Sequence, residues 1–221
     1  VDLAAEGLIR KRLAQRFPDH AVLAEEEGST GAADAPARWL VDPLDGTTNY
    51  VHGHPFVAVS MALEAQEELL VGVVHAPVLG LTWTARRGGG ARRNGKEARV
   101  SEVSSLSSAL CASGFPYDRR TSADNNTEEW ARVIRQAQGV RRCGSAAIDL
   151  CLIADGTYDA FWEKRLNPWD VAAGSLLVME AGGKVDGLDG STVPPWPETV
   201  VATNGLLHDE LRSVLLSEGS V

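Results

Sequence analysis

The eight residues Asp42-Pro-Leu-Asp-Gly-Thr-Thr-Asn49 constrain this chain more than any other stretch of its sequence. They follow the apolar run Trp39-Leu-Val41, which predicts a buried strand ending at Asp42, where Pro43 withholds a backbone donor from the sheet. Two carboxylates three residues apart are hard oxygen ligands of the kind that Mg²⁺ prefers. The Gly-Thr-Thr turn behind them predicts free backbone N–H groups to which an anion can bind. Because Asp-Pro and Asp-Gly pairs also form ordinary turns, this motif alone leaves a simple turn as the alternative to a metal-held phosphate site.

Two further acidic motifs stand at the ends of apolar segments, far from the first in sequence. Glu25-Glu-Glu27 follows the apolar residues 21–24, and Trp169-Asp170 opens an apolar helical pattern that continues to Gly182. Acids placed repeatedly at the ends of hydrophobic elements favour a shared metal site over three unrelated turns.

Together these three motifs resemble the inositol monophosphatase family, which consists of Mg²⁺-dependent, Li⁺-sensitive phosphatases of sugar phosphates. The likeness also takes in residues 56–60, 85–91, 144–147 and 202–204, so it covers nearly the whole chain from Asp2 onward. The resemblance implies a fold of mixed α/β and α+β class, the layered α-β-α-β-α sandwich of the inositol monophosphatase and fructose-1,6-bisphosphatase type. It also implies a homodimer, since relatives in this family usually form one.

The same resemblance implies a set of metal ligands. Two or three Mg²⁺ ions would be held by the carboxylates of Glu25, Asp42, Asp45 and Asp170 and by the backbone carbonyl of Leu44. Two metal ions about 3.5–4 Å apart can hold both the attacking and the leaving oxygen of a phosphoryl transfer. Asp170 could also complement the dipole of the helix that it begins, and the two roles are compatible.

For the nucleophile, the resemblance places Thr47 against the attacking water, oriented by Asp2 from the first helix. Glu25 would share that water as a metal ligand and acceptor, and no covalent phospho-enzyme is expected. Gly46 and Thr48 would add preorganised donors to the phosphate. Without the resemblance, the alternative is that the Thr47 hydroxyl only caps a helix or belongs to a turn.

The substrate-binding residues implied by the resemblance come from both halves of the chain: Asp45, Gly46, Thr47, Thr48, Gly144, Ser145, Ala146, Glu163 and Asp170. Glu163 matches the family's acceptor for substrate hydroxyl groups, and a carboxylate there would repel a second phosphate. Lys164-Arg165 departs from the apolar-Gly pair of bacterial relatives, and we expect the two residues to be a solvated pair.

We therefore predict a phosphoric monoester hydrolase that hydrolyses myo-inositol 1-phosphate, or a similar small polyol monophosphate, by metal-activated water. Histidinol phosphate, fructose 1,6-bisphosphate and nucleotide 3′-phosphates are the alternative substrates. A protein of another class, a non-catalytic partner of the transcription machinery, would use basic loop pairs such as Arg86-Arg87, but the complete metal set favours catalysis.

Composition limits the remaining possibilities. With 44% hydrophobic and 23% charged residues, the 221-residue chain is an ordinary globular protein and not a disordered one. The net charge of −9 argues against a nucleic acid partner, and no apolar run approaches the ~20 residues of a bilayer-spanning helix. Cys111, Cys143 and Cys151 lack a C-x-x-C spacing and are expected to be free thiols in a reducing compartment, so we predict a cytoplasmic protein.

The periodicity of the chain predicts helices over 3–17, 128–137, 145–154, 168–181 and 206–216, and strands over 22–23, 38–41, 57–63, 69–75, 81–84, 109–112, 158–162 and 199–202, with a hairpin turn at Asn94-Gly95. A Ser-rich stretch after Val100 suggests an N-terminal metal-binding α+β domain over 1–104 and a C-terminal substrate-binding α/β domain over 105–221. Relatives carry an additional leading helix, which we expect to be missing from this sequence.

Overall fold

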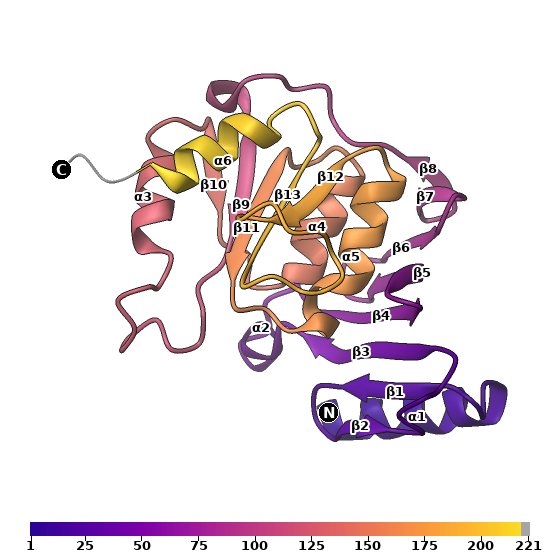
Figure 1. Cartoon of the computed structure of the whole chain (residues 1–221). Helices are drawn as coiled ribbons and strands as arrows, with labels where there is room; N and C mark the ends of the chain where they lie inside the picture. Colours follow the sequence, from indigo (N-terminus) through magenta and orange to yellow (C-terminus); the bar gives the residue numbers. More distant parts are fainter. Residues whose placement is uncertain (218–221) are drawn as a thin grey trace.

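Two β-sheets and the helices around them make up the computed structural model, which describes residues 1–217 (Figure 1). The first sheet has the strand order β2-β1-β3-β4-β5-β6-β7-β8 and the second has the order β10-β9-β11-β13-β12. Within the first sheet β1 runs parallel to β3, and the other neighbours are antiparallel.

The strands of the first sheet are β1 (Ala21–Ala24), β2 (Gly28–Thr30), β3 (Arg38–Asp45), β4 (Ala58–Ala65), β5 (Glu68–Ala76), β6 (Leu81–Arg86), β7 (Gly90–Arg93) and β8 (Lys96–Ala98). Those of the second are β9 (Leu110–Ser113), β10 (Gly139–Arg141), β11 (Ala160–Lys164), β12 (Lys184–Gly187) and β13 (Thr199–Thr203). The helices are α1 (Asp2–Arg16), α2 (Thr47–Val51), the 3₁₀ turn η1 (Leu106–Ser108), α3 (Thr127–Ile134), α4 (Ala146–Ala154), α5 (Pro168–Glu180) and α6 (His208–Leu216).

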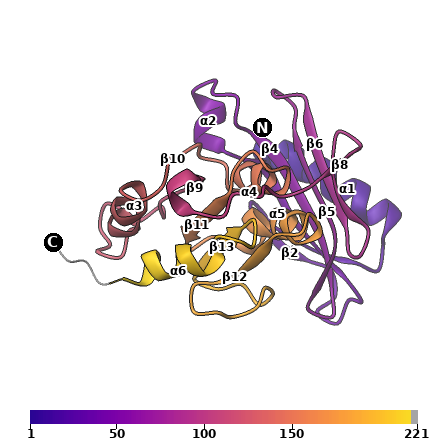
Figure 2. The ribbon, with the colours of Figure 1, turned by 90° about the horizontal axis from the view of Figure 1, so that it is seen from above.

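The layers alternate between helix and sheet (Figures 1 and 2). Helix α1 lies against β3, α4 and α5 fill the space between the two sheets, and α3 and α6 pack together on the far side of the second sheet. This arrangement confirms the predicted layered sandwich.

The two central helices carry apolar residues on all sides, with few polar ones, because both of their faces meet a sheet. Every residue of α4 is buried. Close packing there depends on small residues: a Cβ added at Gly72 would lie 2.9 Å from the carbonyl oxygen of Ala173, and one added at Gly174 would lie 2.5 Å from Cβ of Leu150. The resulting core joins side chains from both sheets, so the division into domains at residue 104 stays a prediction.

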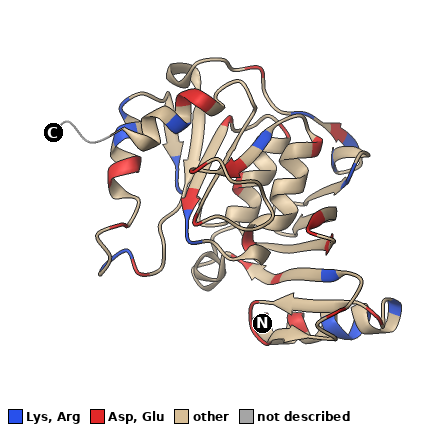
Figure 3. Ribbon diagram, viewed as in Figure 1, with Lys and Arg blue, Asp and Glu red and all other residues tan. Residues whose placement is uncertain are grey.

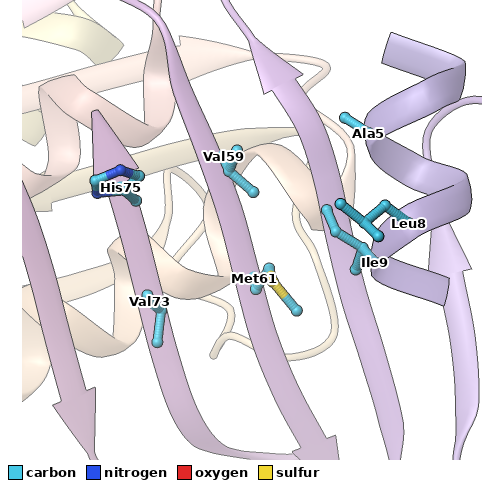
Figure 4. A pocket seen from close by; sticks show the side chains of 7 residues that line it. All are labelled: Ala5, Leu8, Ile9, Val59, Met61, Val73 and His75. Carbon is cyan, nitrogen blue, oxygen red and sulfur yellow. The ribbon is translucent and has the colours of Figure 1, made fainter. Parts of the chain in front are cut away.

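The face of the first sheet that carries α1 has a hollow of about 300 Å³ beside that helix (Figure 4). Its walls come from α1, β4 and β5 and are almost wholly apolar: Ala5, Leu8, Ile9, Val59, Met61, Val73 and His75. Side chains alternate along β4, so the neighbours of Val59 and Met61, including Ser60, point to the opposite face, where α5 lies.

The predicted long elements are present, with ends displaced by a few residues, whereas short strands such as β2, β10 and β12 were not predicted. The expectation of a solvated Lys164-Arg165 pair is wrong for Lys164. That side chain is buried, and its ammonium group contacts the carboxylates of Asp124 and Glu129.

The three cysteines are free, as predicted, with Cys111 and Cys151 buried. Within residues 1–217, no helix combines the length and the apolar character that crossing a membrane requires.

Candidate active site

The two aspartates of the first motif lie at the end of β3, where the strand is irregular. Asp42 pairs with Ser60 and Asp45 pairs with Ala58, so three steps along β3 match two along β4. In a regular strand, residues three apart point to opposite faces. The extra residue, at the proline that cannot donate to the ladder, forms a bulge that corrects this phase and lets both carboxylates turn to one side.

Asp45 is held by the N-terminus of α4, about a hundred residues further along the chain. Its Oδ2 accepts hydrogen bonds from the Ser145 hydroxyl at 2.5 Å and from the amide of Ala147 at 2.9 Å. Ser145 also caps α4, because its hydroxyl oxygen accepts from the amide of Ile148 at 3.3 Å. Both donors to Asp45 use the same oxygen, so Oδ1 is left for another partner.

Asn49 fastens the first motif to the loop before α4, a role that the sequence analysis missed. Its Nδ2 donates to the carbonyl oxygens of Phe56 at 2.8 Å, Cys143 at 2.9 Å and Gly144 at 3.2 Å. Gly46 makes this fit possible: its φ is +91°, and a Cβ there would lie 2.6 Å from the Phe56 carbonyl oxygen. The only signal in the sequence was the position of Asn49 directly behind the Gly-Thr-Thr turn.

Glu25 reaches the same edge of the first sheet, where β3 ends, from the neighbouring strand β1. Strands β1 and β3 are parallel, with Ala24 opposite Val41, so Glu25 follows β1 at the level where Asp42 stands in β3. The Glu25 amide donates to the Val41 carbonyl at 3.3 Å and continues the ladder to this point.

Asp170 comes from the first turn of α5, where Pro168 occupies the first helical position. Its Oδ2 accepts from the Asn167 amide at 2.8 Å, so it takes part in a capping box as well as facing the other acids. The start of α5 is tied to the first sheet by Ser60, whose hydroxyl donates to the Trp169 carbonyl at 3.2 Å. Ser60 is the residue paired with Asp42, so this bond brings Asp170 toward the bulge.

The pKa values of all four acids are raised by burial and by neighbouring acids. Burial raises the pKa of Asp42 well above its usual range, and Asp45, Glu25 and Asp170 raise it further. Burial, opposed by the bond from Ser145 and reinforced by Glu25, raises the pKa of Asp45 to about 6, and burial with the charges of Asp45 and Glu25 raises that of Asp170 to about 7. Burial and neighbouring acids also raise the pKa of Glu25, although Asp42 opposes the shift.

Such a cluster suits a divalent cation. Among residues 1–217 no three His, Cys, Asp or Glu side chains are already grouped to hold a metal ion. The donors nevertheless fit Mg²⁺ chemically, because they are carboxylate oxygens whose mutual repulsion a cation would relieve. The carbonyl oxygen of Leu44 accepts the Thr47 hydroxyl at 3.2 Å and has a second lone pair to offer.

Thr47 begins α2, and Asp2 begins α1. The Thr47 hydroxyl donates to the Leu44 carbonyl, and within residues 1–217 no hydrogen bond joins Thr47 to Asp2. Asp2 is close enough to contribute to the raised pKa of Glu25. Its orienting role toward Thr47 stays a prediction.

Glu163 lies near the end of β11, which runs parallel to β9 and next to it. A Cβ added at Gly114, just beyond β9, would overlap the carboxylate of Glu163, so a side chain there would require this carboxylate to move. Burial raises the pKa of Glu163 to about 8; Arg142 opposes the shift, and Asp45 and Asp170 add to it. Glu163 is therefore within electrostatic reach of the acid cluster.

Asp149 is a further buried acid at this place that the sequence analysis missed. It is 1% exposed on α4, and among the described residues its Oδ1 has no hydrogen-bond partner. Burial and the charge of Glu163 raise its pKa well above the usual range. An aspartate inside an otherwise apolar helix was the available signal.

Comparison with known proteins shows the family of the chain. The model of the inositol monophosphatase family matches residues 1–218. The chain belongs to that family. Members of the inositol monophosphatase family are generally Mg²⁺-dependent phosphatases.

Individual relatives carry two kinds of name. An inositol-1-monophosphatase of Synechocystis sp. is 44% identical over 214 residues, which cover 97% of this chain and 75% of that protein. The Nus factor SuhB of Pseudomonas aeruginosa is 46% identical over 197 residues, covering 86% of this chain and 72% of that protein. The solved structure of the inositol monophosphatase from Anabaena (Nostoc) sp. superposes with a TM-score of 0.94 at 42% identity, covering 97% of this chain and 85% of that one.

Proposed function

We propose that this chain hydrolyses myo-inositol 1-phosphate, or a similar small polyol monophosphate, with the help of Mg²⁺. The observation that supports this most is the convergence of carboxylates from three elements, the neighbouring strands β1 and β3 and the helix α5. Asp42 and Asp45 turn to one side at the bulge, and Glu25 and Asp170 approach them from β1 and α5. Asp42 and Asp45 are buried, and buried acids facing further acids are costly unless a cation joins them.

Glu25, Asp42, Asp45, Asp170 and the carbonyl of Leu44 would hold two or three Mg²⁺ ions. When bound, these ions supply positive charge to the phosphate and make the attacking water more acidic. The protein adds donors of its own, since the first amides of a helix have no acceptor within it. Those of Gly46, Thr47 and Thr48, at the start of α2, would bind the phosphate oxygens.

Thr47 can take part in activating the water. With its proton directed to the Leu44 carbonyl, the hydroxyl oxygen keeps lone pairs that can accept a hydrogen bond from the attacking water. We expect Thr47→Ala to lower kcat by about 10²–10⁴-fold, the usual range for lost proton-transfer assistance, and Thr47→Ser to keep much of the rate. Asp2→Asn separates two routes: a relay through Asp2 predicts a loss as large as that of Thr47→Ala, and direct orientation by Leu44 predicts a small one.

The polyol would lie between α4 and β11. Gly144, Ser145 and Ala146 form the start of α4 beside Asp45, and Glu163 stands opposite, over Gly114. Hydroxyl groups of the ring can hydrogen-bond to Glu163. The negative charges of Asp45 and Asp170 would repel a second phosphate there, which favours monophosphates as substrates.

The decisive test is phosphate release in Mg²⁺ from inositol 1-phosphate, histidinol phosphate, fructose 1,6-bisphosphate and a nucleotide 3′-phosphate. We expect inositol 1-phosphate, or another small polyol monophosphate, to have the highest kcat/KM, and EDTA to abolish turnover. Preference for one of the other three would reassign the substrate. Mg²⁺-dependent turnover of none of the four would contradict the proposal.

Glu163→Ala tests the substrate contact separately. Because the lost hydrogen bond is to ring hydroxyls, kcat/KM should fall about ten- to a hundredfold for inositol 1-phosphate and much less for a featureless aryl phosphate. Equal losses on both substrates would remove Glu163 from ring recognition.

A second candidate function rests on the 46% identity to a protein named Nus factor SuhB. A partner of the transcription machinery would act as a protein surface and would not need the metal ligands. Asp170→Asn distinguishes the two functions: it should abolish phosphate release and leave any complementation of a Nus factor deficiency intact. We further propose a cytoplasmic homodimer that is inhibited by Li⁺, which chromatography and a Li⁺ titration would check.

A further inference from the structure

Helix α1 places a buried carboxylate, Glu6, against the turn between β1 and β2. Glu6 is 0% exposed. Its Oε2 accepts the Glu26 amide at 2.8 Å and its Oε1 accepts the Glu27 amide at 3.0 Å. Figure 3 shows this turn as an acidic (red) corner close to the N-terminus. A single side chain thus holds two successive peptide groups directly behind Glu25.

Arg10, one helical turn further along α1, completes the clamp. Its Nε donates to Oε1 of Glu6 at 2.8 Å, and its two terminal nitrogens donate to the Thr30 hydroxyl at 2.7 Å and the Gly28 carbonyl at 2.6 Å. Burial alone would raise the pKa of Glu6, but the bonds from Arg10 and the two amides outweigh it and lower the pKa. The pair therefore holds the whole of the short strand β2 to the helix as well as the turn.

The clamp acts on Glu25 through the peptide plane. The amide nitrogen of Glu26 shares a rigid plane with the Cα and carbonyl of Glu25, so fixing that N–H fixes the direction in which the chain leaves Glu25. On its other side the Glu25 amide is held by Val41 at 3.3 Å. Glu25 is exposed, and three adjacent carboxylates in this turn repel one another. Without the clamp, the Val41 bond would still hold the Glu25 amide, but the peptide group that follows Glu25 would lose its side-chain acceptor.

We propose that Glu6, supported by Arg10, is a positioning residue for Glu25 and sets the affinity of the acid cluster for Mg²⁺. The inference rests on the proposed function, because it takes Glu25 as a ligand. It goes beyond that function by assigning a determinant of metal affinity to α1, on the outer layer of the molecule.

The chain contains a matched control at the other end of the same sheet. Glu180, at the end of α5, accepts the amides of Gly88 and Gly90, both at 2.8 Å, and so clamps the turn between β6 and β7 in the same way. That turn carries none of the proposed ligands. Glu6→Gln and Glu180→Gln each replace a carboxylate that accepts two turn amides by an amide, and only the turn held by Glu6 follows a proposed ligand.

The experiment measures Mg²⁺ binding by calorimetry without substrate, together with hydrogen exchange at the clamped amides. Glu6→Gln should speed exchange at Glu26 and Glu27 and weaken Mg²⁺ binding about 10–100-fold, the usual effect of losing a residue that orients a ligand. Glu180→Gln should speed exchange at Gly88 and Gly90 and leave Mg²⁺ affinity unchanged. With saturating Mg²⁺, KM for the substrate should stay unchanged in both variants.

Several results would overturn the inference. Equal changes of Mg²⁺ affinity in the two variants would show that the Glu6 clamp is only a general structural contact. Faster exchange at Glu26 without any loss of Mg²⁺ affinity would show the same. If Glu6→Gln does not fold, Arg10→Gln, which keeps both bonds from the amides to Glu6, should still give a smaller loss of affinity, and an unchanged affinity would count against the clamp. A wild-type protein that binds Mg²⁺ but releases no phosphate would refute the proposed function alone, whereas one that binds no Mg²⁺ would refute both.

Discussion

Charged side chains are buried in two regions of the molecule. In one region acids contact basic side chains, and in the other region acids face other acids. Around β11, Lys164 meets Asp124 and Glu129, and below α6 the carboxylate of Asp186 meets His208 at 2.8 Å. At the rim of the first sheet the acids face one another, and no ion pair within residues 1–217 involves Asp42, Asp45 or Asp170. Buried charges that serve the fold are paired, so the unpaired acids mark the place where the chain requires something from outside.

The largest expected difference is between two aspartates, the half-buried Asp170 and the buried Asp186. Asp170→Asn should reduce phosphate release to background while the protein becomes no less stable without Mg²⁺, because one of several repelling acids is gone. Asp186→Asn should keep kcat and lower the free energy of unfolding, because His208 then faces a neutral, weaker acceptor in place of a carboxylate. Kinetics and urea unfolding of both variants check this. Mg²⁺-dependent turnover by Asp170→Asn at the wild-type rate would show that Asp170 is not a required metal ligand.

The next largest effect should be on the pH dependence of stability, which the unpaired acids control. The pKa values of Asp45 and Asp170 are raised to about 6 and about 7, so the folded state favours their protonated forms. Their contribution to stability is complete below the unfolded pKa near 4 and is lost as the pH rises through 6 to 7. In EDTA, the free energy of unfolding should fall by on the order of a few kcal/mol between pH 5 and pH 8.

Saturating Mg²⁺ should cancel most of that fall, since a bound cation favours the ionised carboxylates. Urea unfolding at the two pH values, with and without Mg²⁺, measures both effects. Asp170→Asn serves as the control and should show a shallower fall in EDTA. Stability that rises from pH 5 to pH 8 in EDTA would mean that the acids are already compensated.

Removing the ammonium group of Lys164 should lower the free energy of unfolding less than breaking a fully buried ion pair would. Lys164→Met removes the partner of Asp124 and Glu129, but the Asp124 side chain is 54% exposed and can regain water. We expect a loss of about 1–2 kcal/mol in urea unfolding, below the 3–5 kcal/mol of a fully buried pair broken on one side. The exposed Lys96→Met is the control and should have almost no effect. A stabilising Lys164→Met would show that the cation is not needed for the fold.

The smallest effect belongs to His208, which is 2% exposed. Burial lowers its pKa, and although Asp186 opposes the shift, Lys184 and Arg212 add to it. Stability from the neutral ring is present above the unfolded pKa near 6.5 and is lost as the pH falls through the folded pKa, opposite in sign to the acid cluster. An NMR titration should place the ring pKa below 6.5. A value above 6.5 would show that Asp186 dominates.

The sequence predicted the parts of the site that depend on local pattern. Apolar runs ending in acids located Glu25, Asp42 and Asp170, because a buried strand or helix has to deliver its next polar residue to an edge. The sequence could not reveal that a bulge lets Asp42 and Asp45 face one way, since register depends on the partner strand.

Contacts between residues distant in sequence explain most of what was missed. The three hydrogen bonds of Asn49 involve carbonyls whose position depends on how α4 docks. Lys164 was expected in solvent because its partners, Asp124 and Glu129, lie 40 and 35 residues away in sequence. Strand β12 has only four residues and joins the sheet through β13, so its own pattern is too short to predict it.

The bond from Ser145 to Asp45 has a consequence for how the protein is made. It joins residues 100 positions apart, so a ribosome that has released the first motif still has to synthesise α4 before the carboxylate gains its donors. Helix α5, with Asp170, emerges later still. A nascent chain can therefore build much of the first sheet while it has no capacity for catalysis. Activity should appear late in translation and abruptly, which makes it a reporter for completed assembly of the two halves.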